Sequence, residues 1–332
     1  MNPFWALRIH GPENAHYAKL QRLTLDELTP GEVVIETHYS SVNYKDALAA
    51  LDKAPIMKRY PLNGGIDGAG VVISSIDERF KPGDKVIATG HSIGENFDGG
   101  YSEVMRVSAD SLVKLPEGLS LRESMIIGTA GFTAALAMER MLNNGQTKEH
   151  GPILVTGASG GVGSFAVALF AQAGFEVLAV SGKHDAIKYL KKLGAKEVLP
   201  PNELGLGHRP LERARFGGVV DSVGGKLLAQ ALAHTHLWGN VASIGLAESS
   251  ELQTTVMPFI LRGVSLLGAS SNNTPIKMRQ DLWRRLAGPW KPKQLEDILT
   301  RTVELKDLML AFDDLIHRKI HGRVLVRIRR DE

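Results

Sequence analysis

The 332-residue sequence contains no cysteine. Disulfide bonds, thiol nucleophiles and cysteine-ligated zinc sites are therefore excluded. No apolar run approaches the roughly 18 uninterrupted residues that a membrane span needs. The first residues, MNPFWALRIHGPEN, show no basic segment followed by an apolar core. We expect neither a membrane helix nor an export signal, and we predict a cytoplasmic protein.

The charge pattern also argues against several partners. The formal net charge is +3, and the chain has no long tract of lysine and arginine. An anionic small molecule accounts for this mild excess as well as a nucleic acid does, so a nucleic-acid partner is unsupported. The 11 histidines include no H-x-x-x-H pair on a convincing helix with carboxylate support, and we assign none to a metal.

The length and the order of patterns predict two domains. Short β-branched runs separated by turns fill the first third, which is typical of a mostly antiparallel β-domain. From about Leu121 strands alternate with helices up to VSLLGASS, which predicts βαβ units and a parallel sheet covered on both faces. Two helical segments follow Ser271, and the terminal strand GRVLVRIRR must pair elsewhere, plausibly with the β-domain.

A glycine-rich stretch links a strand to a helix in the middle of the chain. Residues 153–156 form a short apolar strand, and VTGASGGVG leads into a helix with Val162, Phe165, Ala166, Leu169 and Phe170 on one face. Gly160 and Gly161 allow backbone N–H groups to approach a pyrophosphate, and Gly163 allows close packing of helix on strand. Ala158 occupies the first glycine position of G-x-G-x-x-G, so the match is incomplete, and a turn that binds nothing remains the alternative.

The ends of the following strands supply further candidates. About 20 residues after the loop, where NAD sites carry a carboxylate, stand Ser181, Gly182 and Lys183. A hydroxyl and an ammonium group suit a 2′-phosphate, so NADPH is predicted over NADH, unless Lys183 is a solvated lysine opening the next helix. The small strand ends near Ser222 and at Gly245-Leu246 would pass beneath ribose and nicotinamide; small residues there are also ordinary loop chemistry.

With these residues assembled, the chain resembles the medium-chain dehydrogenase/reductase superfamily over essentially its whole length. Within that superfamily it looks like the zinc-free quinone-oxidoreductase branch, and most like the acrylyl-CoA reductase subgroup. The resemblance is carried by these segments: SSVNYKD (40–46), GIDGAGVV (65–72), PGDKV (82–86), GGYSEV (99–104), GTAGFTAA (128–135), VTGASGGVG (155–163) and TTVMPFILRGVSLLG (254–268).

This resemblance implies an α/β fold in which a GroES-like β-domain (residues 1–121 and 273–332) carries an inserted Rossmann-type, doubly wound parallel sheet (122–272), with the active site in the cleft. It implies metal-free, NADPH-dependent reduction of acryloyl-CoA to propanoyl-CoA by a homodimer. The residues carried over are Tyr44 beside the reaction centre, Ser159, Gly160, Gly161 and Val162 at the pyrophosphate, and Ser181 and Lys183 at the 2′-phosphate. Lys183 departs from the family, which more often has arginine there.

The predicted chemistry is hydride transfer to the β-carbon of a double bond conjugated to a thioester, followed by protonation of the α-carbon. Tyr44 is the candidate proton donor or carbonyl orienter, or it merely packs against the nicotinamide. Asn43 and Asp46 beside it are better explained as turn or cap residues. Arg323 reaches the cofactor from the tail, or it is a solvated arginine at a strand end. Five cations near the cleft rim receive CoA phosphates, or they line solvated helix faces: Arg279, Arg284, Arg285, Lys291 and Lys293.

Two other functions fit the same residues. A general NADPH-dependent quinone or enone reductase would use the same scaffold with a less particular pocket. A non-catalytic NADPH-binding sensor would bind the dinucleotide tightly without turnover. The three hypotheses differ in whether an enoyl-CoA thioester, a quinone or neither oxidises NADPH.

Overall fold

The computed structural model describes residues 2–11 and 16–329. The chain forms two compact units. The first comprises Met1–Thr129, Ser271–Gly288 and Leu299–Glu332, and the second Ala130–Ser270 and Pro289–Ile298. The sequence and the family resemblance predict domain limits at 121/122 and 272/273, with residues 1, 12–15 and 330–332 of the predicted ranges outside the described part. These limits, as boundaries between a catalytic domain and a cofactor-binding domain, remain a prediction.

The first unit is built mainly from antiparallel strands. A seven-stranded sheet has the order β15-β16-β3-β5-β6-β8, with β7 also paired to β3, and a three-stranded sheet has the order β2-β1-β4. The strands are β1 (Phe4–His10), β2 (Tyr17–Leu23), β3 (Val33–Ser41), β4 (Leu62–Asn63), β5 (Asp67–Ser75), β6 (Lys85–Thr89), β7 (Val104–Val107), β8 (Leu112–Lys114), β15 (Leu299–Val303) and β16 (Arg323–Arg327).

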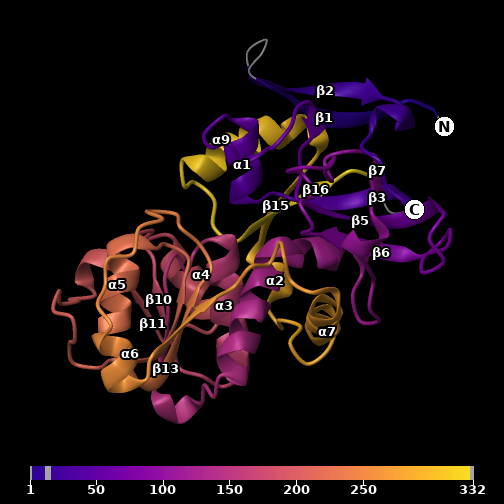
Figure 1. Cartoon of the computed structure of the whole chain (residues 1–332). Helices are drawn as coiled ribbons and strands as arrows, with labels where there is room; N and C mark the ends of the chain where they lie inside the picture. Colours follow the sequence, from indigo (N-terminus) through magenta and orange to yellow (C-terminus); the bar gives the residue numbers. More distant parts are fainter. Residues whose placement is uncertain (1, 12–15, 330–332) are drawn as a thin grey trace. The chain divides into compact units, whose positions relative to one another are not determined.

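The terminal strand pairs as predicted, since β16 lies antiparallel to β3, with Leu325 opposite Ser41. Helices α1 (Tyr44–Ala50) and α9 (Leu308–Ile316) lie side by side (Figure 1) and share a core with β16. Ala47 of α1 and Phe312 of α9 are fully buried in it. This packing fixes the inner face of α1 and leaves its first residue, Tyr44, at the surface. The unit also contains α7 (Ile276–Ala287) and the short 3-10 helices η2 (Leu25–Glu27), η3 (Ala109–Ser111) and η6 (Leu305–Asp307).

The second unit contains the predicted parallel sheet. Its six strands have the order β11-β10-β9-β12-β13-β14, and every neighbouring pair is parallel. Counted from β9, this is the 3-2-1-4-5-6 order of dinucleotide-binding folds. The strands are β9 (Ile153–Val155), β10 (Val177–Val180), β11 (Glu197–Leu199), β12 (Phe216–Asp221), β13 (Thr235–Ser243) and β14 (Ser265–Gly268).

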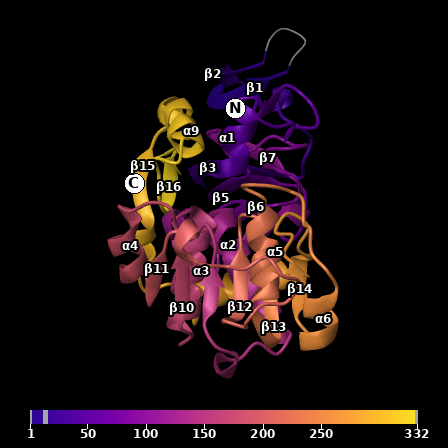
Figure 2. The ribbon, with the colours of Figure 1, turned by 90° about the vertical axis from the view of Figure 1, so that its left-hand side faces the viewer.

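Helices connect these strands and flank the sheet (Figure 2). They are α3 (Gly161–Gln172), α4 (Ala186–Lys192), α5 (Gly225–Ala233) and α6 (Met257–Arg262), with the 3-10 helix η5 (Pro201–Glu203). The unit also contains α8 (Leu295–Ile298) and the 3-10 helix η4 (Lys148–His150). Helix α3 is buried from Gly163 to Phe170, more completely than a one-face pattern predicts, and Val162 is only half-buried.

The long helix α2 (Leu121–Asn143) is interrupted at Gly128, whose φ of 48° and ψ of −159° are not helical. Among the described residues it is the only helix long and apolar enough to cross a membrane, but 78% of its apolar window is buried inside the protein. Its apolar composition is therefore explained by packing in the core.

Candidate functional site

The glycine-rich loop of the second unit forms a tight turn between β9 and α3. Gly157 has a φ of +58°, and Gly160 is the N-cap of α3 with extended φ and ψ. A Cβ at Gly163 would collide with the carbonyl oxygen of Gly157, so this glycine is required for the close approach of helix and loop. The first backbone N–H groups of a helix have no partner within it and carry positive partial charge, so the N-terminus of α3 offers donors of the kind that suit an anion.

Two serines connect this loop to the end of β10. The Ser181 hydroxyl donates to Ser159 Oγ at 3.0 Å and accepts a hydrogen bond from Lys183 N at 3.2 Å. Both serines are buried, whereas Gly182 is exposed and Lys183 half-buried. The segment predicted to bind the pyrophosphate is therefore hydrogen-bonded to the segment predicted to bind the 2′-phosphate. Hydroxyl and ammonium groups at the end of β10 are suitable partners for a phosphate.

The end of β12 holds a second group of predicted residues. Ser222 Oγ is buried and has no hydrogen-bond partner within the described part of the chain. A Cβ at Gly245 would lie 2.6 Å from the carbonyl oxygen of Ser222, so the two strand ends touch, and Leu246 beside them is exposed. A buried hydroxyl without a partner, next to a glycine, fits a polar ligand bound at the carboxyl ends of these strands.

The residues that fix the Ser222 segment are not among the site residues predicted from the sequence. Asp221 accepts hydrogen bonds from Thr156 Oγ1 at 2.6 Å and Gly224 N at 2.7 Å, and Ser222 N donates to Thr156 Oγ1 at 3.1 Å. Burial raises the pKa of Asp221 above its ordinary value. The signal was an acidic residue at the end of the apolar run GVVD.

In the first unit, Tyr44 is the first residue of α1 and is 47% exposed. Asn43 before it is the N-cap, and the Asp46 side chain accepts the hydrogen bond of Asn43 N at 2.9 Å. The interpretation of Asn43 and Asp46 as cap residues is therefore confirmed. The proposed role of Tyr44 at the reaction centre remains a prediction.

A buried polar cluster lies beneath this helix start. Asp67 accepts hydrogen bonds from Asn43 Nδ2 at 2.8 Å and from Thr129 N and Oγ1 at 3.0 Å and 2.6 Å. Burial and the nearby charge of Asp67 raise the pKa of Asp46 to about 7, although the hydrogen bond from Tyr101 and two backbone N–H groups oppose the shift. Burial and Asp46 also raise the pKa of Tyr101 well above its ordinary value. Asp67 and Tyr101, which lie in GIDGAG and GGYSEV, are not among the site residues predicted from the sequence.

Arg323 belongs to the same cluster. Its guanidinium donates to the carbonyl oxygens of Ile126 at 3.1 Å and Val42 at 3.0 Å, and lies 3.8 Å from Asp67 Oδ2. With only 3% of its surface exposed, it is not a solvated arginine at a strand end. It is a buried counter-ion to Asp67, and its contact with a cofactor remains a prediction.

The prediction that Arg279 belongs to a basic cluster at the surface is wrong. This arginine is 1% exposed and donates to Thr89 Oγ1 at 2.9 Å and to the carbonyl oxygen of Ser271. Burial lowers its pKa to about 10. It fastens two backbone segments together, so it is not placed to receive phosphates at the surface. The i, i+3, i+4 pattern of α7 puts Arg279 on the inner face, whereas Arg284 is exposed and pairs with Asp281.

The donor set does not suit a metal. Residues 2–11 and 16–329 contain no group of three or more His, Asp and Glu side chains that could hold a metal ion, and the sequence has no cysteine. We therefore derive no step through zinc.

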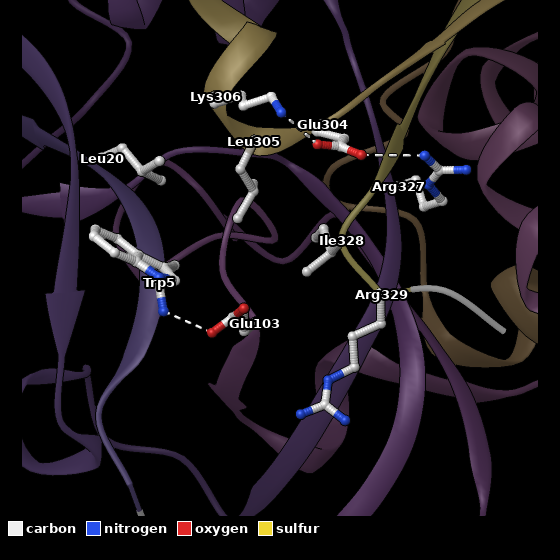
Figure 3. Close-up of a pocket in the computed structure, with 9 residues that line it drawn as sticks. All are labelled: Trp5, Leu20, Glu103, Glu304, Leu305, Lys306, Arg327, Ile328 and Arg329. Carbon is white, nitrogen blue, oxygen red and sulfur yellow. Dashed lines mark hydrogen bonds and ion pairs between the residues drawn. The ribbon is translucent and has the colours of Figure 1, made fainter. Parts of the chain in front are cut away.

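Two cavities lie away from the predicted residues. One of about 280 Å³ in the first unit includes Trp5, Leu20 and Lys306 (Figure 3). Most of its polar groups are already paired: Glu103 accepts from Trp5 N, Glu304 pairs with Lys306 and Arg327, and Arg329 pairs with Glu36 outside the cavity. The other, of about 410 Å³, lies beside α5 in the second unit. Neither is lined by a predicted site residue.

The sheet order, the glycine turn and the terminal strand returning to the β-unit define an alcohol-dehydrogenase-like oxidoreductase. The model described as "Alcohol dehydrogenase GroES-like domain" matches residues 29–117, and "Zinc-binding dehydrogenase" matches residues 161–288. The chain belongs to the medium-chain dehydrogenase/reductase superfamily, in the branch that contains the acrylyl-CoA reductases and the quinone oxidoreductase YhfP. The predicted family and fold class are thus confirmed.

Three relatives carry this assignment. The chain is 45% identical over 312 residues to the acrylyl-CoA reductase AcuI of Ruegeria pomeroyi, covering 94% of each chain. It is 44% identical over 310 residues to the putative quinone oxidoreductase YhfP of Bacillus subtilis, covering 93% of this chain and 94% of the relative, whose solved structure has NAD bound. The yhdH oxidoreductase of Salmonella enterica, crystallised with NADP, has a TM-score of 0.94 and 44% identity, covering 98% of this chain and all of that one.

Proposed function

We propose that this protein is an oxidoreductase that reduces acryloyl-CoA to propanoyl-CoA with NADPH and without a metal. The observation that supports it most is 45% identity to an acrylyl-CoA reductase over 94% of both chains. The unpartnered hydroxyl of Ser222 and the linked pair Ser159 and Ser181 add support, because they leave polar groups for a dinucleotide. We assign the GroES-like domain to residues 1–121 and 273–332 and the cofactor domain to residues 122–272.

The residues divide the work of binding. We propose that Ser159, Gly160, Gly161 and Val162 hold the pyrophosphate, and that Ser181, Gly182 and Lys183 hold the 2′-phosphate. We propose that Tyr44, Ser222, Gly245, Leu246 and Arg323 contact the remainder of the cofactor. Helix α3 supplies backbone N–H donors and a positive helix end, while Lys183 supplies a point charge.

When bound, NADPH supplies a hydride for the β-carbon of the acryloyl double bond. The protein must then supply a proton for the α-carbon and stabilise negative charge on the thioester oxygen. We assign the proton to the Tyr44 hydroxyl. The 47% exposure of Tyr44 allows the phenol to regain a proton from water after each turnover.

A quinone reductase is the second candidate, favoured by the 44% identity to YhfP. Anaerobic NADPH oxidation with acryloyl-CoA, crotonoyl-CoA and a simple benzoquinone separates the two. Acryloyl-CoA should give the highest kcat/KM, with crotonoyl-CoA lower by about 10-fold or more, since one added carbon in a fitted pocket changes specificity by this order. A higher kcat/KM for the quinone would reject the CoA assignment, and NADPH binding without turnover of any of the three would indicate a sensor.

We also propose a homodimer formed through β14. This strand is the edge of the parallel sheet and presents Leu266, while Trp238 of β13 and Ile260 of α6 are 69% and 71% exposed. A second β14 would pair with the open edge and cover these side chains. Leu266→Lys should give a monomer in light scattering, whereas the control Ile76→Lys, at a residue 89% exposed in the first unit, should leave the dimer intact. A wild-type monomer would refute this.

A cytoplasmic location is proposed together with this function, because the enzyme draws on a soluble dinucleotide and a CoA thioester. Fractionation of the source cells, with the activity recovered in the soluble cytoplasmic fraction, is the expected result.

A further inference from the structure

The proposed proton donor, Tyr44, stands at a position that its own packing does not fix. Its ring is 47% exposed, and it is the first residue of α1, a helix of only seven residues. A short helix is marginal by itself, and its first turn has few internal hydrogen bonds: Asp46 N and Ala47 N both donate to the carbonyl oxygen of Asn43, at 3.1 Å and 3.3 Å. The position of the phenol therefore depends on what holds the backbone at residues 43–46.

Asp46 is the group that holds it. Its carboxylate is 3% exposed and accepts four hydrogen bonds. Oδ2 accepts from Asn43 N at 2.9 Å, Asn43 Nδ2 at 3.2 Å and Tyr101 OH at 2.9 Å, and Oδ1 accepts from Ile66 N at 2.9 Å. One side chain thus joins the start of α1 to the segment before β5 and to a buried tyrosine.

The partners of Asp46 are themselves fixed. Tyr101 is fully buried, and its hydroxyl also lies 3.1 Å from the carbonyl oxygen of Ser41 at the end of β3. Asn43 Nδ2 is shared with Asp67, and Asn43 Oδ1 accepts from Arg323 at 3.1 Å. The backbone on both sides of Tyr44 is therefore tied to the sheet through Asp46 and Asn43.

An amide at position 46 fails to reproduce this arrangement. Asp46 needs two acceptor oxygens, because Ile66 N bonds to one and Asn43 N to the other. An asparagine offers one oxygen and one NH₂ group, so one backbone N–H would face a donor. A buried N–H without an acceptor is strongly unfavourable, and the first turn of α1 would shift to satisfy it.

From this geometry we propose that Asp46 is a positioning residue for Tyr44. It acts on the reaction only by fixing the backbone that carries the phenol. The inference rests on the proposed function in one respect, the role of Tyr44 in proton transfer.

A double-mutant cycle tests the proposal with the full-length enzyme, NADPH and acryloyl-CoA. Asp46→Asn should lower kcat by about 10- to 100-fold, since a misplacement near 1 Å has effects of this order. The KM for NADPH should stay within about twofold, because the cofactor loop is untouched. In a Tyr44→Phe background the same change should lower kcat less than about threefold, because there is no phenol left to misplace.

Asp98→Asn is the matched control. Asp98 is 1% exposed, accepts backbone N–H groups of Thr29 at 2.6 Å and Asn63 at 2.8 Å, and lies in the same unit, with no contact to α1 among its hydrogen bonds. It should lower the Tm as Asp46→Asn does, with kcat per folded enzyme nearly unchanged. Equal losses of kcat in Asp46→Asn and Asp98→Asn, or independent effects of Asp46→Asn and Tyr44→Phe, would overturn the proposal.

The remaining outcomes are also decisive. If Asp46→Asn is recovered unfolded, Tyr101→Phe replaces it in the cycle: a kcat loss that vanishes in the Tyr44→Phe background supports the proposal, and an equal loss or none overturns it. If Tyr44→Phe alone leaves kcat unchanged while acryloyl-CoA is reduced, positioning fails and the proposed function stands. If the wild-type enzyme reduces no substrate, the proposed function fails, and hydrogen exchange of the backbone amides of residues 44–50 tests whether Asp46 fixes this helix start. Faster exchange in Asp46→Asn than in Asp98→Asn supports that role, and equal exchange overturns it.

Discussion

Replacing Arg323 by methionine removes the positive charge from a buried cluster that contains two carboxylates. Asp67 and Asp46 are 0% and 3% exposed, and the guanidinium lies 3.8 Å from Asp67 Oδ2. Three further acceptors, the carbonyls of Ile126 and Val42 and the amide of Asn43, lose their donor. Breaking a buried pair from one side destabilises a protein by about 3–5 kcal/mol, because the other charge stays buried and unpaired.

Urea unfolding and thermal melting check this value. For a unit of about 180 residues, a loss near 4 kcal/mol corresponds to a Tm decrease of about 8–16 °C. Asp67→Asn in the Arg323→Met background should restore part of the loss, since it removes the unpaired charge. Arg323→Lys keeps the positive charge but not the fork of donors. Its free energy of unfolding should therefore lie between those of the wild type and Arg323→Met.

The result that would refute this reasoning is a loss of less than about 1 kcal/mol for Arg323→Met, the size typical of an exposed ion pair. A large decrease in NADPH affinity with unchanged stability would also refute it, and would leave Arg323 with the proposed cofactor contact alone.

Three other perturbations test the remaining assignments. Lys183→Ala should weaken NADPH binding by about 10- to 100-fold, the size of a lost charge-assisted hydrogen bond, and leave the affinity for NADH nearly unchanged, both measured by titration calorimetry. Equal affinities of the wild-type protein for NADPH and NADH would reject the 2′-phosphate site. Tyr44→Phe should lower kcat by about 100-fold or more with little change in NADPH affinity; an unchanged kcat would remove its acid role. The pKa of Asp46 is about 7 in the folded protein and near 3.8 when unfolded, so the folded state alone holds this proton between those pH values. The free energy of unfolding contributed by Asp46 should therefore fall as pH rises from about 4 to 7, by about 4 kcal/mol at 1.36 kcal/mol per unit, and urea titrations of Asp46→Asn should lack this slope.

The cofactor part of the fold was predictable because its residues lie close together in the sequence. A strand, a glycine turn and a helix occupy residues 153–172, and steric rules alone explain Gly157 and Gly163. The alternation of strands and helices then predicted the parallel sheet. Even the terminal strand β16 was placed with the β-domain, because a lone strand needs a partner.

The cluster beneath Tyr44 was not predictable in the same way. Its members come from β3, the start of α1, β5, the residues around Gly100, the interruption of α2 and β16, and no spacing in the sequence joins them. Arg279 and Arg323 show the same limit. Each was grouped with surface charges or strand ends by its neighbours in the chain, yet both are buried by contacts with residues far away in sequence.

The charges within this cluster explain why it is assembled from so many segments. Two buried carboxylates require more compensation than one guanidinium provides, and the donors around them are backbone N–H groups, hydroxyls and an amide. These donors come from Asn43 at the start of α1, from Ile66 before β5 and from Thr129 at the interruption of α2, and each group would otherwise be buried without a partner. Gly128 completes the arrangement, because a Cβ there would lie 2.6 Å from Asp67 Oδ2 and from Ser41 Oγ. The carboxylates therefore serve as shared acceptors for the backbone on which Tyr44 stands, and a change to either one should be detected first in the placement of that helix start.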